Sequence, residues 1–265
     1  MYDKLQLSLP AAVDRKAVLE CLDRVLDPEL DESILELGFV ESLEVEHGQL
    51  TVDLRLPTYW CAPNFTFLMA DDVRRELLSV ENVETVTVRL LDHFASEAVA
   101  DAVNAGRSFP EAFPDEAFEN LTQLRALFLR KGFIKRLDLL LQELRGAGLS
   151  LEEITRLKVE DVRIEGDGWD VRRDDGGARR IRIGAAKVVQ RYLERRGELG
   201  IDRSPASALV TDLRGDSLSA EELEKYRVRA RTVRVALDAN GALCSTLLRA
   251  RQAETKRCDD DQQQG

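Results

Sequence analysis

The order of helix-like and strand-like segments predicts an α+β protein with two domains. We expect a small N-terminal domain with helices on one face of a short three-stranded sheet, followed by a mainly helical C-terminal domain with a small β-hairpin or sheet. The 265 residues suffice for two domains of usual size. The charge also divides the chain, because residues 1–114 hold 9 Lys and Arg against 22 Asp and Glu, whereas the remaining residues hold 29 against 27.

Glycine and proline mark the expected boundary. Gly106, Ser108, Pro110 and Pro114 follow one another at short intervals and interrupt the preceding helical pattern. The last residues are rich in Asp and Gln, a composition typical of disorder. We therefore expect an N-terminal domain over residues 1–106, a linker over 107–114, a mainly helical domain over 115–256 and a disordered tail over 257–265.

The spacing of apolar residues predicts the elements of the first domain. Asp14 can cap a helix, and the apolar residues after it recur every three to four positions. Leu50, Val52 and Leu54 alternate with polar residues, as in a half-buried strand, and His47-Gly48 before them suits a tight hairpin turn. The expected order is a helix over 14–26, strands over 40–46 and 49–56, a helix over 65–79, a strand over 83–90 and a helix over 96–105.

The second domain shows mainly helical patterns. Ser150 and Glu153 have the spacing of a capping box at the start of a helix. We expect further helices over 115–129, 133–145, 185–196, 220–237 and 242–253, short strands within 159–164, 169–172 and 180–183, and turns at 167–168 and 176–177.

Cys61 is the most promising reactive residue. It lies between a strand-like and a helix-like run, where backbone N–H groups and the helix dipole can favour a thiolate. The position suits anion binding, soft-metal ligation or nucleophilic chemistry. The alternative interpretation is packing, because free cysteine is among the most buried residue types.

Composition excludes several other classes of protein. The cysteines are widely spaced and form no C-x-x-C pair, so they indicate a reducing compartment and neither a disulfide framework nor a self-contained zinc site. No apolar run approaches the roughly 20 residues that span a bilayer, and no signal peptide is recognisable, so we expect a cytoplasmic protein without a membrane partner. The acidic first half argues against nucleic acid as its ligand. His47 and His93 lie in no recognisable hydrolase motif.

Four segments together resemble a known family. They are Asp27-Pro28-Glu29, the segment 34–40, Thr58-Tyr59-Trp60-Cys61 and the segment 83–88. In order and spacing they resemble the D-P-E, I-x-x-L-G, T-x-x-C and V-x-x-V-x-V motifs of the SufT/PaaD-like iron-sulfur cluster assembly family. The resemblance covers about residues 14–92. Two positions depart from the family pattern: the proline after the cysteine is displaced to Pro63, and the aspartate-proline-x-tryptophan motif reads Asp92-His93-Phe94-Ala95.

The resemblance implies an accessory factor for metalloprotein maturation, not an enzyme. Such a factor binds iron or an iron-sulfur cluster transiently and delivers it to a client, such as a multicomponent oxygenase. By residue-level carry-over it implies Cys61 as the reactive cysteine, with Asp27 and Glu29 as the acidic motif of the metal site. The supporting motif residues are Thr58, Pro28 and Gly38. A single thiolate with one carboxylate leaves the metal releasable, and a homodimer partner, the client or cluster-assembly proteins would complete the ligand set. The acidic motif also admits a plainer interpretation as a solvated helix end.

The segment from Gly148-Leu149-Ser150-Leu151-Glu152-Glu153-Ile154 to Arg191-Tyr192-Leu193, with its helix, three short strands and helix, resembles more generically the start of a tyrosine-recombinase catalytic domain. The arginine that this family needs falls on Ser150, and no histidine follows His93, so its H-x-x-R motif is absent and strand-exchange catalysis is excluded.

Arg179, Arg180 and Arg182 form a basic cluster that could bind a partner. Arginine clusters can engage phosphates, but the acids between them favour solvated faces and inter-domain salt bridges. A protein-binding surface is equally compatible. The alternative function is thus a non-enzymatic adaptor or nucleic-acid-binding regulator that acts through the C-terminal domain, with Cys61 as packing.

Overall fold

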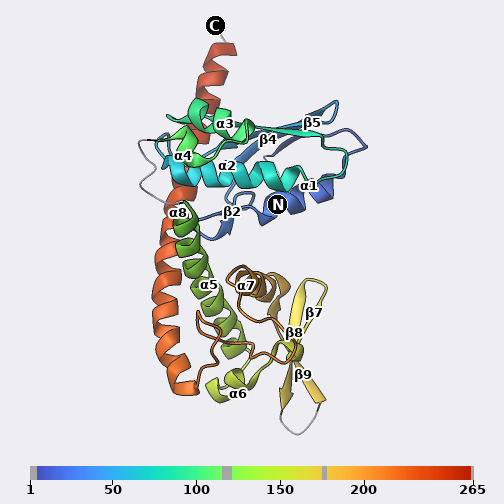
Figure 1. The fold of residues 1–265 in the computed structure, drawn as a ribbon, viewed down its shortest axis with the longest axis vertical. Helices are drawn as coiled ribbons and strands as arrows, with labels where there is room; N and C mark the ends of the chain where they lie inside the picture. The colour runs from blue at the N-terminus through green and yellow to red at the C-terminus, as the bar shows by residue number, and fades with distance from the viewer. Residues whose placement is uncertain (1–4, 115–120, 175–177, 264–265) are drawn as a thin grey trace. The chain divides into compact units, whose positions relative to one another are not determined.

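In the computed structural model, residues 5–114, 121–174 and 178–263 are described. The chain forms two compact units: unit 1 consists of Met1–Arg125 and Asp238–Gly265, and unit 2 consists of Ala126–Leu237. The long helix α8 (Ala220–Gln263) begins in unit 2 and ends in unit 1 (Figure 1). The sequence assigned residues 115–256 to one domain, whereas residues from Asp238 onward group with unit 1 here. The predicted assignment of domains stays a prediction.

The α+β fold class is confirmed. In unit 1 the elements before α8 are β1 (Gln6–Ser8), α1 (Arg15–Arg24), β2 (Leu26–Asp27), β3 (Glu32–Ser33), β4 (Val40–Glu46), β5 (Gln49–Arg55), α2 (Pro63–Leu77), β6 (Thr85–Leu91), α3 (Ser96–Asn104), α4 (Phe109–Ala112) and the start of α5 (Leu121–Gly146). The predicted helices and strands over residues 14–105 occur in the predicted order, but the two-residue strands β2 and β3 between α1 and β4 were not predicted.

The main sheet of unit 1 has four strands, in the order β1-β4-β5-β6. The expected three strands are present, but β1 was missed because it has only three residues and pairs with β4 in parallel. Strands β4 and β5 form the predicted hairpin, and His47 and Gly48 at its turn have φ values of 48° and 80°, in the left-handed region that such a turn requires. Strand β6 lies parallel to β5.

The two faces of this sheet differ in polarity. Leu43, Val52 and Val88 occupy paired positions on neighbouring strands and are fully buried. Ser42 and Asp53 lie on the opposite face, where Arg89 donates to both carboxylate oxygens of Asp53 at 2.6 and 2.7 Å. The apolar face is covered by helices, of which α1 and α2 lie side by side (Figure 1). One apolar face and one polar face explain the alternating strand pattern in the sequence.

The segment predicted as a linker contains structure. Helix α4 lies inside residues 107–114, and Ser108 and Glu111 form a capping box at its start. Phe109 is buried, with its ring 5.5 Å from that of Phe67 in an edge-to-face arrangement. The proline and glycine residues therefore delimit a short helix that belongs to the core of unit 1.

Unit 2 packs helices against a small antiparallel sheet. Its elements are the remainder of α5, α6 (Leu151–Arg156), the 3₁₀ turn Val159–Asp161, β7 (Val162–Glu165), β8 (Gly168–Asp174), β9 (Ala178–Ala185), α7 (Ala186–Glu198) and the first part of α8. Trp169 and Tyr192 are fully buried, and each polar end has a partner: the indole N–H donates to Glu143 at 2.7 Å and the Tyr192 hydroxyl donates to the carbonyl of Leu209 at 2.8 Å. The predicted capping box of Ser150 and Glu153 is present. The predicted turn at 176–177 lies outside the described residues.

Two helices were wrongly divided by the sequence analysis. Helix α5 is continuous and joins the end of the predicted helix 115–129 to the predicted helix 133–145. Helix α8 likewise joins the predicted helices 220–237 and 242–253. The gaps between the predicted helices contain Gly132 and Gly241. A single glycine costs a helix only about 1 kcal/mol relative to alanine, which packing readily offsets. Helix α8 also continues into the segment predicted as a disordered tail, since residues 250–263 contain no glycine or proline to end it.

Among the described residues, no helix is both long and apolar enough to cross a membrane.

Candidate functional site

The candidate site lies where strands β5 and β6 end. The two strands are parallel, and Arg55 at the end of β5 pairs with Leu91 at the end of β6. The segments that follow the two strands therefore meet at one edge of the sheet. The first segment carries Cys61 and leads into α2, and the second carries His93 and leads into α3.

Cys61 is partly exposed and has a polar neighbour at its sulfur. The Sγ atom lies 3.2 Å from the hydroxyl oxygen of Thr58, close enough for a hydrogen bond. When the sulfur is a thiolate it can only accept, so Thr58 is then the donor. Cys61 also packs against the hydrophobic core of unit 1, so its thiol is partly buried and partly open to solvent.

His93 holds the backbone of the Cys61 segment. This buried imidazole has its Nε2 2.8 Å from the carbonyl oxygen of Cys61, and its Nδ1 accepts a hydrogen bond from the backbone N–H of Ala95 at 3.2 Å. Since Nδ1 accepts, Nε2 carries the proton and donates to Cys61. Burial lowers the pKa of His93; the Cys61 carbonyl acts to raise it, and the charge of Arg251 lowers it further. The neutral ring is therefore the form that fits this position.

The acidic motif has a structural function. One carboxylate oxygen of Asp27 accepts the backbone N–H groups of Glu29 at 2.9 Å and of Leu30 at 2.8 Å, and so caps the turn that contains Pro28. Asp27 is buried, whereas the Glu29 side chain is exposed. The structure does not place the motif at a solvated helix end, because it forms a capped turn between β2 and β3.

Gly38, the glycine of the second motif, has φ of 75°. Residues with a Cβ are strained in this left-handed conformation, which explains why a glycine stands there. A Cβ at this position would lie 3.9 Å from Cδ2 of Leu248, so the last part of α8 passes close to the turn.

Helix α8 adds a second thiol to the surroundings of the motif residues. Cys244 is partly buried in unit 1. Burial raises the pKa of its thiol to about 11, and electrostatic interactions with Asp27, Cys61 and Glu29 contribute to the rise. All three candidate ligand residues therefore act electrostatically on one sulfur of α8.

These residues do not form a closed metal site. In the part of the chain that the structure describes, no three His, Cys, Asp or Glu side chains are grouped so that they could hold a metal ion. Asp27 and Glu29 are near the thiols in the electrostatic sense, but they do not complete a ligand set with Cys61.

Exposed aromatic side chains surround the Cys61 segment. Tyr59, Trp60 and Phe94 are 51%, 74% and 49% exposed. The ring of Tyr59 lies 6.3 Å from that of Trp60 and 6.2 Å from that of Phe94, and the N–H of Phe94 donates to the carbonyl of Tyr59 at 3.0 Å. We call these three residues the aromatic patch. Large exposed aromatic groups of this kind are enriched at protein interfaces.

The arginines predicted as partner-binding residues lie in unit 2, and most of their described charge is paired. Arg180 forms an ion pair with Asp170 and donates to the carbonyl of Asp161 at 2.9 Å. Arg182 lies 3.7 Å from Asp167. The side chain of Arg179 lies outside the described residues. Both ion pairs join residues of unit 2, so neither is one of the predicted inter-domain salt bridges.

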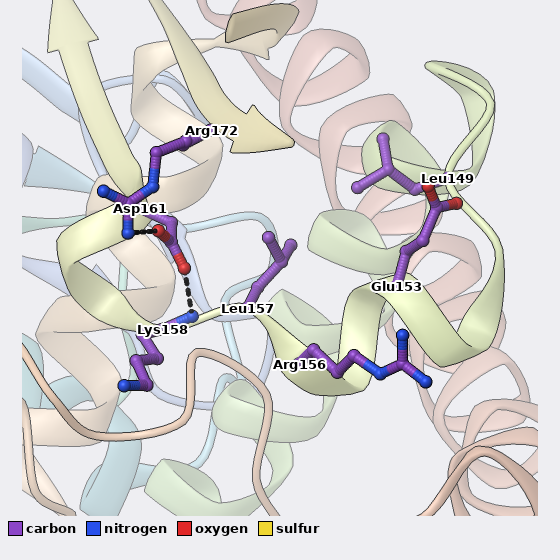
Figure 2. Close-up of a pocket in the computed structure, with 7 residues that line it drawn as sticks. All are labelled: Leu149, Glu153, Arg156, Leu157, Lys158, Asp161 and Arg172. Atoms are coloured by element: carbon purple, nitrogen blue, oxygen red, sulfur yellow. Dashed lines mark hydrogen bonds and ion pairs between the residues drawn. The ribbon is translucent and has the colours of Figure 1, made fainter. Parts of the chain in front are cut away.

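Unit 2 also contains a cavity of about 310 Å³, shown in Figure 2. Asp161 accepts a hydrogen bond from the backbone N–H of Lys158 at 2.9 Å and pairs with Arg172 at 2.7 Å, as the dashed lines show. The remaining lining residues are Leu149, Glu153, Arg156 and Leu157. The cavity contains none of the motif residues, and its charges are partly paired with one another.

Sequence reasoning missed three features of the site. His93 could have been found from the parallel pairing of β5 and β6, which places the segments after both strands together, but the strand directions were not predicted. The aromatic patch was visible in the residues but not as a surface. The position of Cys244 had no signal in the sequence, because helical periodicity does not say which unit the end of α8 contacts.

Comparison with known proteins agrees with the resemblance drawn from the motifs. Residues 15–88 match the model of a family described as iron-sulfur cluster assembly protein. The matched segment contains all four motifs, including Cys61, and lies within unit 1. The chain matches no curated protein and no solved structure. The resemblance of the second half to tyrosine recombinases stays a prediction.

Proposed function

We propose that this protein is an accessory factor in the maturation of iron-sulfur or iron proteins, and that it holds iron or a cluster transiently at Cys61. The match of residues 15–88 to the iron-sulfur cluster assembly family supports a role in this process. The observation that carries the assignment to Cys61 is its position in that segment as a partly exposed thiol with a hydroxyl 3.2 Å from its sulfur. The metal or cluster is cargo in this scheme, and the protein itself catalyses no reaction.

The chemistry of the site suits release as well as binding. Iron-sulfur clusters in stable proteins are held by four thiolates, or by two thiolates and two histidines. The site described here lacks any group of three ligands among the described residues. A metal bound through so few protein ligands keeps positions open for a client, for a second copy of the chain or for a cluster-assembly protein. Asp27 and Glu29 contribute negative charge near the thiol in this proposal.

His93 and Thr58 have positioning functions. The imidazole donates to the carbonyl of Cys61 and fixes the backbone that carries the thiol. The Thr58 hydroxyl can stabilise the thiolate by donating to it. Neither side chain needs to touch the metal to affect its binding, as is usual for groups that orient a ligand.

The aromatic patch is where we expect a client to dock. Tyr59 and Trp60 precede Cys61 directly, so a protein bound on these rings would have its own ligands within reach of the thiol. A client enzyme that accepts iron, such as a multicomponent oxygenase, is compatible with docking on the aromatic patch.

The experiment that tests the proposal is anaerobic reconstitution with Fe²⁺ and sulfide, followed by analysis of iron and acid-labile sulfide. We expect wild type to retain both and Cys61→Ser to lose most of them. Cys21→Ala is the matched control, since Cys21 is a buried thiol of the same unit whose sulfur contacts Arg24. Equal retention by wild type and Cys61→Ser would contradict the proposal.

The alternative, an adaptor or nucleic-acid-binding regulator, stays a prediction. The ion pairs of Arg172, Arg180 and Arg182 with aspartates use part of the charge that phosphate binding would need. No contact among the described residues specifically favours an adaptor or a nucleic-acid-binding function.

A further inference from the structure

The last part of α8 presents one face to the motif residues of unit 1. Gly241, Cys244, Leu248 and Arg251 follow one another at intervals of three, four and three residues, so they lie along one face of the helix. The described contacts show that this face is the one directed at the family segment.

Three of these four residues have defined contacts. A Cβ at Gly241 would lie 4.0 Å from Cδ2 of Leu30, the residue whose N–H is capped by Asp27. Leu248 is 3% exposed and belongs to the hydrophobic core of unit 1. Arg251 donates to the carbonyl of Leu56 at 2.7 Å and to the carbonyl of Asp92 at 2.6 Å.

These contacts bracket Cys244. Gly241 lies one turn before Cys244 and faces Leu30 of the acidic turn. Leu248 lies one turn after Cys244 and faces Gly38. Arg251 lies two turns after Cys244 and contacts the segments that lead to Cys61 and His93. The neighbouring Leu243 is 59% exposed and Leu247 is 37% exposed, so they lie away from this face. Along the helix, Cys244 therefore lies between the residue next to the D-P-E turn and the residues next to Gly38 and Leu56.

We propose that Cys244 is a second thiolate ligand for the iron or cluster that Cys61 carries. The inference rests on the proposed function and names a ligand that the four family motifs do not contain. Two thiolates per chain supply half of a four-thiolate set, so sulfide, a client or a second copy provides the rest.

Metal binding at Cys244 must displace the proton of its thiol, so the affinity for the metal should increase with pH.

The test uses Co²⁺ alone as the probe, under anaerobic conditions, with the full-length protein. Bound thiolates give a thiolate-to-cobalt charge-transfer absorption whose intensity grows with their number. We expect wild type to show the band, and Cys61→Ser and Cys244→Ser each to show about half its intensity, with affinity at least about tenfold weaker. Cys21→Ala should match wild type.

A relocated thiol provides the sharper control. The double variant Cys244→Ser with Leu243→Cys restores the number of thiols but moves one of them to the exposed face of the helix, so we expect it to behave like Cys244→Ser alone. Cross-linking of wild type with a short thiol-specific bifunctional reagent, followed by peptide mass spectrometry, tests the pairing without any substitution. It should join Cys61 to Cys244.

The outcomes separate the two proposals. A Cys244→Ser variant with the full band, beside a Cys61→Ser variant that loses it, overturns the second ligand and leaves the proposed function standing. Rescue by the relocated thiol, or absence of the Cys61 to Cys244 cross-link, also overturns the second ligand. Absence of the band from wild type, together with no retained iron, overturns both proposals.

Discussion

Replacing Leu248 by alanine tests whether the end of α8 is bound to unit 1 as the structure has it. The side chain is 3% exposed in the core of unit 1, although it comes from a helix that begins in unit 2. Leu248→Ala removes three carbon groups, each worth about 0.8 kcal/mol when buried, or about 2.4 kcal/mol in total. A residual cavity would add to this, within the roughly 2–5 kcal/mol usual for such changes.

The loss should appear as local opening of the helix end. A decrease of about 2.4 kcal/mol corresponds to roughly a 50-fold increase in the opening equilibrium. Two measurements report it: labelling of the Cys244 thiol, and hydrogen exchange of the amides of residues 241–251. Leu247→Ala is the matched control, because the neighbouring leucine is 37% exposed and its loss should change the labelling rate only slightly. Equal labelling rates in the two variants would refute the docked arrangement of α8.

Three further predictions concern the motif residues and their neighbours. Asp27→Ala should lower the free energy of unfolding by about 1–2 kcal/mol, measured by urea denaturation, because it removes the acceptor of two backbone N–H groups. Asp27→Asn keeps an acceptor oxygen, so it should retain stability but bind iron less tightly. Equal stability of the two variants would exclude the capping function. Burial lowers the pKa of His93 below its ordinary value of about 6.5, so the stability that the neutral ring supports is present above pH 6.5 and is lost as the pH falls through the lowered pKa. His93→Gln cannot be protonated, so the free energy of unfolding should decrease less between pH 7 and pH 5 in this variant than in wild type. An unchanged pH profile would contradict this function of His93. Trp60→Ala should leave stability within about 0.5 kcal/mol but slow delivery of iron to a client, measured as the transfer rate, and unimpaired transfer would argue against the aromatic patch as the docking surface.

The local parts of the fold were predictable because they depend on neighbouring residues. The alternation of Leu50, Val52 and Leu54 defined β5, and His47 with Gly48 defined its turn, since left-handed backbone angles are read directly from residue type. The capping box of Ser150 and Glu153 is equally local. In each case the residues that determine the structure are within a few positions of one another.

Features that depend on distant contacts were not predictable. The predicted helices 220–237 and 242–253 left a gap, but α8 is continuous there, and Leu248 is buried in unit 1. The sequence shows the helix and cannot show its partner. Similarly, His93 was assigned no function because its contact with Cys61 arises from the parallel pairing of two strands, which apolar alternation does not encode.

The metal-binding functions predicted for the motif residues stay predictions, but the structure shows what some of these side chains contact. Asp27 was expected near the metal, yet one of its oxygens caps a turn, a function that the D-P-E sequence also permits. Its role as a ligand stays a prediction, as does that of Glu29. Thr58, in contrast, lies beside the Cys61 sulfur, as the T-x-x-C spacing suggests for a turn that precedes a helix.

The central claim is that Cys61 carries iron or a cluster that can be released. The most direct measurement is transfer from the anaerobically reconstituted protein to an apo-ferredoxin that binds a [2Fe-2S] cluster through four cysteines, followed by the absorption of the ferredoxin product. Wild type should convert the apo-ferredoxin faster than the same amount of free iron and sulfide, and Cys61→Ser should give no acceleration over that background. Equal acceleration by wild type and Cys61→Ser would contradict the claim that this thiol is the carrier.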